Sequence, residues 1–111
     1  MLDHEGLDVY QCSIEFLAIA FTIVGRLPRG YAALADQLRR AATSIPLNIA
    51  EAAGRSSRQE RLHFHAIARG SAMECGAILD VVRLLHIAEA DVSRGKELLV
   101  RAVAMLSRMS R

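Results

Sequence analysis

The sequence predicts an all-α protein, and more specifically an up-down-up-down four-helix bundle, from its composition, its hydrophobic periodicity and its short connections. Hydrophobic residues make up 52% of the 111 residues, aromatic residues only 5%, and there is no Trp. A chain rich in Ala, Leu, Ile and Arg is typical of packed helices rather than of sheets. This length supports one core, so we expect residues 1–111 to form a single domain, with helices at about residues 8–26, 31–53, 57–86 and 91–109. Four helices joined by short connections alternate in direction.

The first expected helix, residues 8–26, is apolar around most of its circumference. Glu15 is the only charged residue between Val9 and Gly25. One apolar stripe contains Ile14, Leu17, Ala18, Phe21 and Val24, and a second contains Phe16, Ile19, Ala20 and Ile23. A helix that is apolar on both sides needs a second cover, so we expect an outer face of Phe16, Ile19 and Ile23, with the neighbouring part of the second helix, to bury against another subunit. A monomer with an unusually apolar surface is the alternative.

The second expected helix, residues 31–53, contains Pro46 and ends at Gly54. A proline inside a helix removes a backbone hydrogen bond and costs about 3 kcal/mol. The apolar register nevertheless continues across it, through Leu38, Ala42, Ile45 and Ile49. We therefore expect one helix that is kinked at Pro46, not two helices with a loop between them.

A row of polar side chains follows this second helix beside its apolar stripe. It consists of Gln37, Arg40, Ser44, Asn48 and Glu51, and the third helix offers Arg69, Ser71 and Glu74 as partners. Buried polar groups must find hydrogen-bond partners, so we expect these eight residues to form a polar network within or between subunits. Ligand binding by the same row is the alternative.

The third and fourth expected helices each begin at a capping signal. Ser57 and Glu60 have the spacing of a capping box, and Asp91 is the expected cap of the fourth helix. Gly70 and Gly76 lie inside the third helix and cost about 1 kcal/mol each relative to Ala. We expect a neighbouring backbone to approach closely at these glycines.

The sequence contains no pattern typical of an enzyme, a metal site or a cofactor site. Glu60-x-x-His63 occurs once, whereas a di-iron bundle needs this element on two helices. Cys12 and Cys75 stand alone on apolar segments, which predicts buried free thiols, with a disulfide as the alternative. The acidic N-terminal segment does not fit a secretory signal, and the apolar run of residues 16–25 is too short to span a bilayer. We expect a cytoplasmic, non-enzymatic protein with no membrane association.

Basic residues gather around the turn between the second and third helices. The formal net charge is only +2, too small to indicate nucleic-acid binding by itself. Arg55, Arg58 and Arg61 nevertheless cluster at this turn, with Arg39 in the preceding helix. The cluster is either a solvated bundle end or, if subunits form a ring, a repeated basic rim able to bind nucleic acid.

Four segments resemble the four-helix bundle proteins named after intervening sequences in 23S ribosomal RNA genes. They are LDVYQ (7–11), LP (27–28), QLRRAATSIPLNIAEAAGR (37–55) and AIARGSAME (66–74). The resemblance covers the first three helices in order, although the nearly uncharged first helix and the pair Ala52-Ala53 before Gly54 depart from the family pattern. It implies a bacterial protein that assembles as a homopentameric, barrel-like ring.

The resemblance also implies a function. A close relative of this family is the accessory variability determinant of diversity-generating retroelements, which works with a reverse transcriptase and RNA through a basic surface. We therefore expect an RNA-associated accessory protein that contacts RNA through Arg39, Arg55, Arg58 and Arg61. The alternative is a structural scaffold that binds a protein partner, such as a reverse transcriptase, without direct RNA contact.

Overall fold

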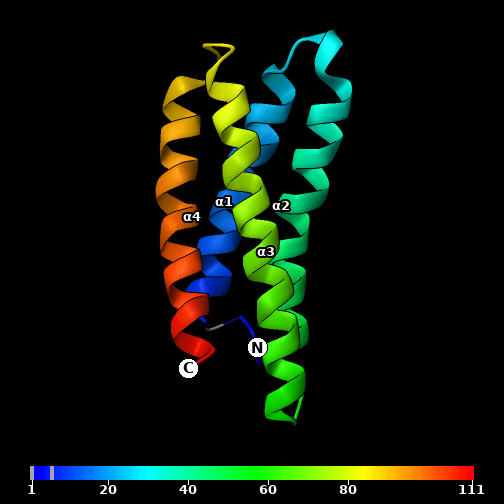
Figure 1. Cartoon of the computed structure of the whole chain (residues 1–111), viewed down its shortest axis with the longest axis vertical. Helices are drawn as coiled ribbons and strands as arrows, with labels where there is room; N and C mark the ends of the chain where they lie inside the picture. Colours follow the sequence, from blue (N-terminus) through cyan, green and yellow to red (C-terminus); the bar gives the residue numbers. More distant parts are fainter. Residues whose placement is uncertain (1, 6) are drawn as a thin grey trace.

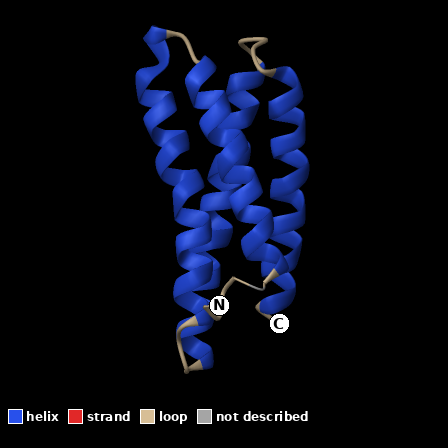
Figure 2. Cartoon of the chain, turned by 180° about the vertical axis from the view of Figure 1, so that it is seen from behind, coloured by secondary structure: helices blue, strands red, loops and turns tan. Residues whose placement is uncertain are grey.

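The computed structural model describes residues 2–5 and 7–111, and within these residues it contains four α-helices and no strand. The helices are α1 (Asp8–Arg26), α2 (Ala32–Ala53), α3 (Arg58–Arg83) and α4 (Glu89–Met109), and a short 3-10 turn, η1 (Arg29–Tyr31), leads into α2. The all-α prediction is confirmed, as the view coloured by secondary structure also shows (Figure 2). The expected bounds were less accurate at the last connection, because α3 ends at Arg83 and α4 already begins at Glu89.

The four helices lie lengthwise beside one another in a body of 44 × 26 × 22 Å (Figure 1). α1 packs on α2, α2 on α3, α3 on α4, and α4 back on α1, whereas among the described residues no Cα atom of α1 lies within 8 Å of one in α3, and none of α2 within 8 Å of one in α4. The helices therefore occupy the corners of a square, with α1 and α3 on one diagonal. Both ends of the chain lie at the same end of the bundle (Figure 1).

Every helix contributes one buried face to a single continuous core. The largest fully buried side chains are Phe16 and Ile23 of α1, Leu38, Ile45 and Ile49 of α2, Leu79 and Val82 of α3, and Leu98 and Leu106 of α4. Complete burial of a Leu or Ile side chain contributes about 1.5–3 kcal/mol. Packing of these faces, not helix propensity, therefore provides most of the stability.

The prediction that Phe16, Ile19 and Ile23 form the outer face of α1 is wrong. Phe16 is 1% exposed and Ile23 is fully buried, whereas Ile14 is 41% and Phe21 is 48% exposed. Ile19 is partly buried and packs against the core. The two stripes of α1 are similarly apolar, so hydrophobicity alone could not decide which one faces inward.

A close contact with α4 fixes the rotation of α1. Gly95 of α4 is buried, and a Cβ atom at this position would lie 3.0 Å from Leu79 Cδ1 and 3.3 Å from Phe16 Cε1. The missing side chain thus leaves room for the Phe16 ring between α1 and α4. The stripe that contains Phe16 is consequently the inner one.

Pro46 lies inside the continuous helix α2 and is buried. The apolar residues on both sides of it, Leu38, Ala42, Ile45 and Ile49, are all fully buried. The prediction of a helix through Pro46 in place of a loop is confirmed. Gly54 follows as the C-cap of α2, as predicted.

The helix starts differ in how well the sequence predicts them. Ser57 caps α3 as predicted, since its hydroxyl oxygen accepts a hydrogen bond from the Glu60 amide at 3.0 Å. Asp91 does not cap α4, because that position is taken by Ala88, which has a positive φ of 46° and no side-chain cap. His86 in the same turn also has a positive φ, 55°. This turn between α3 and α4 contains no glycine, so the sequence does not show that its residues adopt the left-handed conformation.

The prediction of a close approach at Gly70 and Gly76 is wrong within the chain. Apart from the chain neighbours and the surrounding helix backbone of each glycine, no described atom lies within 4 Å of the position that a Cβ would take at either residue. Both glycines therefore border open space.

By length and composition, α1 is apolar enough to cross a membrane, with a mean hydropathy of 1.3 over an 18-residue window. The sequence argument that this segment is too short to span a bilayer considered only residues 16–25, whereas the whole helix has 19 residues. Core helices of soluble proteins have the same property, and the inner face of α1 is part of the core here.

Candidate nucleic-acid interface

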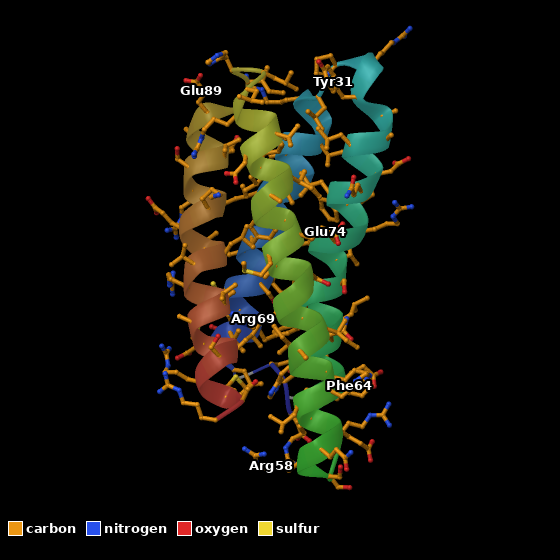
Figure 3. The ribbon with its side chains drawn as sticks, viewed as in Figure 1. Tyr31, Arg58, Phe64, Arg69, Glu74 and Glu89 are labelled. Carbon is orange, nitrogen blue, oxygen red and sulfur yellow. The ribbon has the colours of Figure 1, made fainter. Side chains whose placement is uncertain are left out.

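The turn between α2 and α3 brings Arg55, Arg58 and Arg61 to one end of the bundle. Figure 3 shows Arg58 at this end, on the same helix as Phe64. Gly54 ends α2 and Ser57 begins α3, so only a short connection separates the two helices. The predicted clustering of these three arginines follows directly from this tight turn.

Arg55 is neutralised by two carboxylates. Its Nη2 atom lies 2.8 Å from Glu51 Oε2, and its Nη1 atom lies 3.4 Å from Glu60 Oε2. The guanidinium carbon also lies 5.0 Å from the centroid of the Phe64 ring, which is a cation–π distance. Arg55 therefore stabilises the turn and adds little free positive charge to this end.

Arg58 and Arg61 are held by main-chain oxygens and not by Asp or Glu side chains. Arg61 Nη1 donates hydrogen bonds to the carbonyl oxygens of Ser56 at 2.8 Å and Arg55 at 3.3 Å. Arg58 Nη2 donates to the main-chain oxygen of Arg111, the last residue of the sequence, at 2.8 Å. Neither guanidinium forms an ion pair with an Asp or Glu side chain in the described part of the chain. Each still has N–H donors to spare, because a guanidinium carries five.

Arg39 is not part of this cluster. Arg39 lies on α2, whereas Arg55 follows the end of that helix. The sixteen residues between them correspond to about 24 Å at 1.5 Å per residue. The Nη1 atom of Arg39 is 2.6 Å from Asp36 Oδ1, so its charge is paired locally. The structure does not bring Arg39 together with the other three predicted residues.

Part of the predicted polar network joins α2 to α3. Ser71 Oγ donates to Ser44 Oγ at 2.8 Å, and Asn48 Nδ2 donates to both the carbonyl oxygen (2.8 Å) and the hydroxyl oxygen (2.9 Å) of Ser44. Nearer the other end of the same helices, Gln37 Nε2 donates to Glu74 Oε2 at 3.3 Å. We call these five residues the α2–α3 polar seam.

The other three predicted members of the network have different roles. Glu51 pairs with Arg55 on its own side of the turn, and Arg69 Nε donates to Ser107 Oγ of α4 at 3.1 Å. Arg40 is exposed and forms no side-chain hydrogen bond or ion pair with the residues that the structure describes. The eight residues thus form several separate contacts and not one network.

His65 is a buried polar residue that the sequence interpretation missed. It is 6% exposed, and its Nδ1 atom has no hydrogen-bond partner among the residues that the structure describes. Burial, with a smaller contribution from the nearby Arg61 charge, lowers the pKa of His65. The signal was present, since His65 begins the buried heptad-like series that continues with Ala68, Ala72, Cys75 and Leu79.

The two cysteines are free and buried, as predicted. Cys12 Sγ donates to the carbonyl oxygen of Leu98 at 3.3 Å. Burial raises the pKa of Cys75 to about 12, so this thiol is unreactive at neutral pH. Among the described residues, no group of three or more His, Cys, Asp or Glu side chains is arranged to hold a metal ion, and His63 packs edge-on against Phe64.

The comparisons with known proteins bear on the whole bundle. No curated protein matches the sequence. The family described as 23S rRNA-intervening sequence protein matches residues 5–108, which include α1, α2, α3, the α2–α3 turn and all of α4 except its last residue. The chain belongs to the 23S rRNA-intervening sequence protein family.

Proposed function

We propose that this protein is a non-enzymatic, RNA-associated accessory protein that works as a ring-like homo-oligomer, a pentamer as the resemblance implies. In this proposal each subunit is an up-down-up-down bundle with α2 bent at Pro46, and the ring acts in the bacterial cytoplasm without metal, cofactor or membrane. Family membership supports the association with RNA.

The observation that carries the proposal is the state of Arg58 and Arg61. Their guanidinium groups are held by main-chain oxygens, and no Asp or Glu side chain among the described residues pairs with either of them, so Arg61 in particular is positioned by neutral carbonyl groups. An arginine in this state can still donate to phosphate oxygens. Ring symmetry repeats the pair in every subunit and concentrates a positive potential that one subunit alone lacks.

The scaffold function is the second candidate, in which the ring binds a protein such as a reverse transcriptase without touching RNA. It is favoured by exposed apolar side chains outside the basic end, such as Val81 (46% exposed) and Leu84 (76% exposed). The proposed relation to the accessory variability determinant fits both candidates.

A salt titration of RNA binding tests the proposal. A fluorescent single-stranded RNA is titrated with the native protein from about 50 to 200 mM salt, a range in which phosphate contacts lose affinity steeply. The double variant R58A/R61A should bind more weakly, with the slope of log affinity against log salt reduced by roughly 1.4 for two lost contacts on single-stranded RNA.

The matched control is R26A/R29A, which removes the same charge from two exposed arginines at the connection between α1 and α2. It should leave RNA affinity nearly unchanged. Equal losses in both double variants would indicate a nonspecific effect of net charge. No binding by the native protein at about 50 mM salt would favour the scaffold function.

A further inference from the structure

An uncharged ridge runs along the outside of α1. It consists of Ile14, Ala18 and Phe21, which follow one another at helical spacing, and all three are exposed. The nearest charge, Glu15, is held by Arg94 of α4, whose Nη2 atom lies 2.8 Å from Glu15 Oε1. We call these three residues the α1 ridge.

A hollow of about 480 Å³ lies between α3 and α4. Exposed side chains of Met73, Ala77, Val100 and Ala104 line it, with Val100 68% and Met73 55% exposed. Gly76 also lines it and has open space where a side chain would be, so a neighbouring helix can approach the backbone closely. We call this hollow the α3–α4 groove.

The α3–α4 groove is electrically neutral. Its two charged lining residues pair with each other, since Lys96 Nζ lies 2.5 Å from Asp80 Oδ1. A nucleic acid needs unpaired cations, and an acidic or basic peptide needs an unpaired opposite charge. The groove therefore fits an uncharged apolar surface with protruding side chains, and the α1 ridge of a second copy has these properties.

The positions of ridge and groove favour a ring over a symmetric pair. α1 lies on the diagonal opposite α3, with α4 packed against both. The ridge on the outside of α1 and the groove between α3 and α4 therefore lie on different sides of the bundle. The groove lies between the neighbouring helices α3 and α4, so it is not on the face of the bundle directly opposite α1. Contacts between two different surfaces generate a ring when the rotation from copy to copy closes.

We propose that the α1 ridge of one copy packs into the α3–α4 groove of a second copy, and that this repeated junction closes the ring. The proposal rests on the homo-oligomer proposed above and assigns its contacting surfaces. A helix of 19 residues is about 28 Å long and about 10 Å wide, so one junction covers roughly 300 Å² of α1 face, less than the ~800 Å² per partner of a stable complex. Native protein should therefore be found as monomer and closed ring, with little of the open intermediates.

Cross-linking through single introduced cysteines tests the pairing of the two surfaces. A18C places a thiol on the ridge and A77C places one on the groove, and both native thiols are buried. Under mild oxidation an equimolar mixture of the two variants, exchanged in low concentration of denaturant, should give a disulfide-linked dimer. Each variant alone should stay uncross-linked, and D36C on the charged outside of α2 is the matched control.

Charge insertion gives the second readout, measured by light scattering after size exclusion. F21E on the ridge and V100E on the groove should each dissociate the ring to folded monomers, as judged by helical circular dichroism, whereas A33E on α2 should leave it intact. Cross-linking of A18C with itself would overturn the proposal in favour of a symmetric ridge contact. A ring that survives both F21E and V100E overturns the assigned surfaces but not the oligomer, and native protein that is found only as a monomer, with no closed ring, overturns the oligomer itself.

Discussion

His65 is a buried titratable residue whose environment makes the stability of the fold depend on pH. Its lowered pKa means that the folded state binds a proton less readily than the unfolded state does. The stabilising effect of the neutral form is therefore complete above the unfolded pKa of about 6.5 and is lost as the pH falls below it. We expect acidification from pH 7.5 to 5.5 to lower the free energy of unfolding.

The variant H65F should remove this part of the pH dependence, because phenylalanine fills a similar volume without a titrating group or an unpaired nitrogen. Denaturant unfolding at pH 7.5 and 5.5 measures the difference between the two pH values. That difference should be smaller in H65F than in the native protein, whereas H63Q, at an exposed histidine, should leave it unchanged. An equal reduction in both variants would mean that burial of His65 is not the cause.

We expect the protein to be more stable with glycine than with histidine at position 86. Its φ of 55° is unfavourable for a side chain, and the residue is exposed. We expect H86G to raise the free energy of unfolding by about 0.5–1 kcal/mol, since the surface pair with Glu89 contributes little. Guanidinium unfolding at pH 7.5 measures this change, and a loss of stability would show that the turn depends on the His86 side chain.

At the scale of helices, glycines in similar sequence contexts have opposite roles. Gly95 faces Phe16 and Leu79 across a tight contact, whereas Gly70 borders open space. We expect G95V to destabilise the protein by about 1–3 kcal/mol through overpacking. G70A should stabilise it by about 1 kcal/mol through helix propensity. Thermal unfolding of the two variants checks the pair, and a neutral G95V would mean that α1 can shift away from α4.

The α2–α3 polar seam should show energetic coupling between its helices. The Ser44 hydroxyl accepts hydrogen bonds from both Ser71 and Asn48, so S44A removes the acceptor of the Ser71 hydroxyl, whereas Asn48 keeps its bond to the Ser44 carbonyl oxygen. A double-mutant cycle of S44A and S71A should give a coupling energy of about 0.5–1.5 kcal/mol in denaturant unfolding. Additive effects would indicate that water replaces the Ser44–Ser71 bond. The pair Q37A and R40A, which share no hydrogen bond, is the comparison cycle.

Comparison of the helices explains which parts of the fold the sequence could predict. On α2 the polar and apolar residues separate, so its buried face and its passage through Pro46 followed from periodicity. On α1 they do not separate, and the Phe16–Gly95 contact decided the buried face; it depends on α4, which is distant in sequence. The basic cluster followed from the position of the turn. The ion pairs of Arg39 with Asp36 and of Arg55 with Glu51, however, depend on side-chain rotamers that a sequence does not specify.

For the whole molecule, assembly and RNA binding should be coupled. If each subunit presents only the Arg58 and Arg61 pair, affinity depends on the number of pairs that one RNA contacts at once. The monomeric variant F21E keeps both arginines, yet its affinity for RNA at about 50 mM salt should fall on the order of 100-fold. Fluorescence anisotropy measures this, with A33E as the control. Unchanged affinity in an F21E monomer would show that one subunit suffices.

The packing scheme has a topological consequence. The helix contacts form a closed cycle, since α4 packs back on α1, and the chain ends share one end of the bundle, where Leu7 and Met109 line the same hollow. A circular permutant that joins these ends and opens the turn between α3 and α4 would read α4, α1, α2, α3 and keep all four packed pairs. It would also replace the left-handed residues of that turn by free termini. The fold is thus specified by which helices are neighbours, with no helix required to come first.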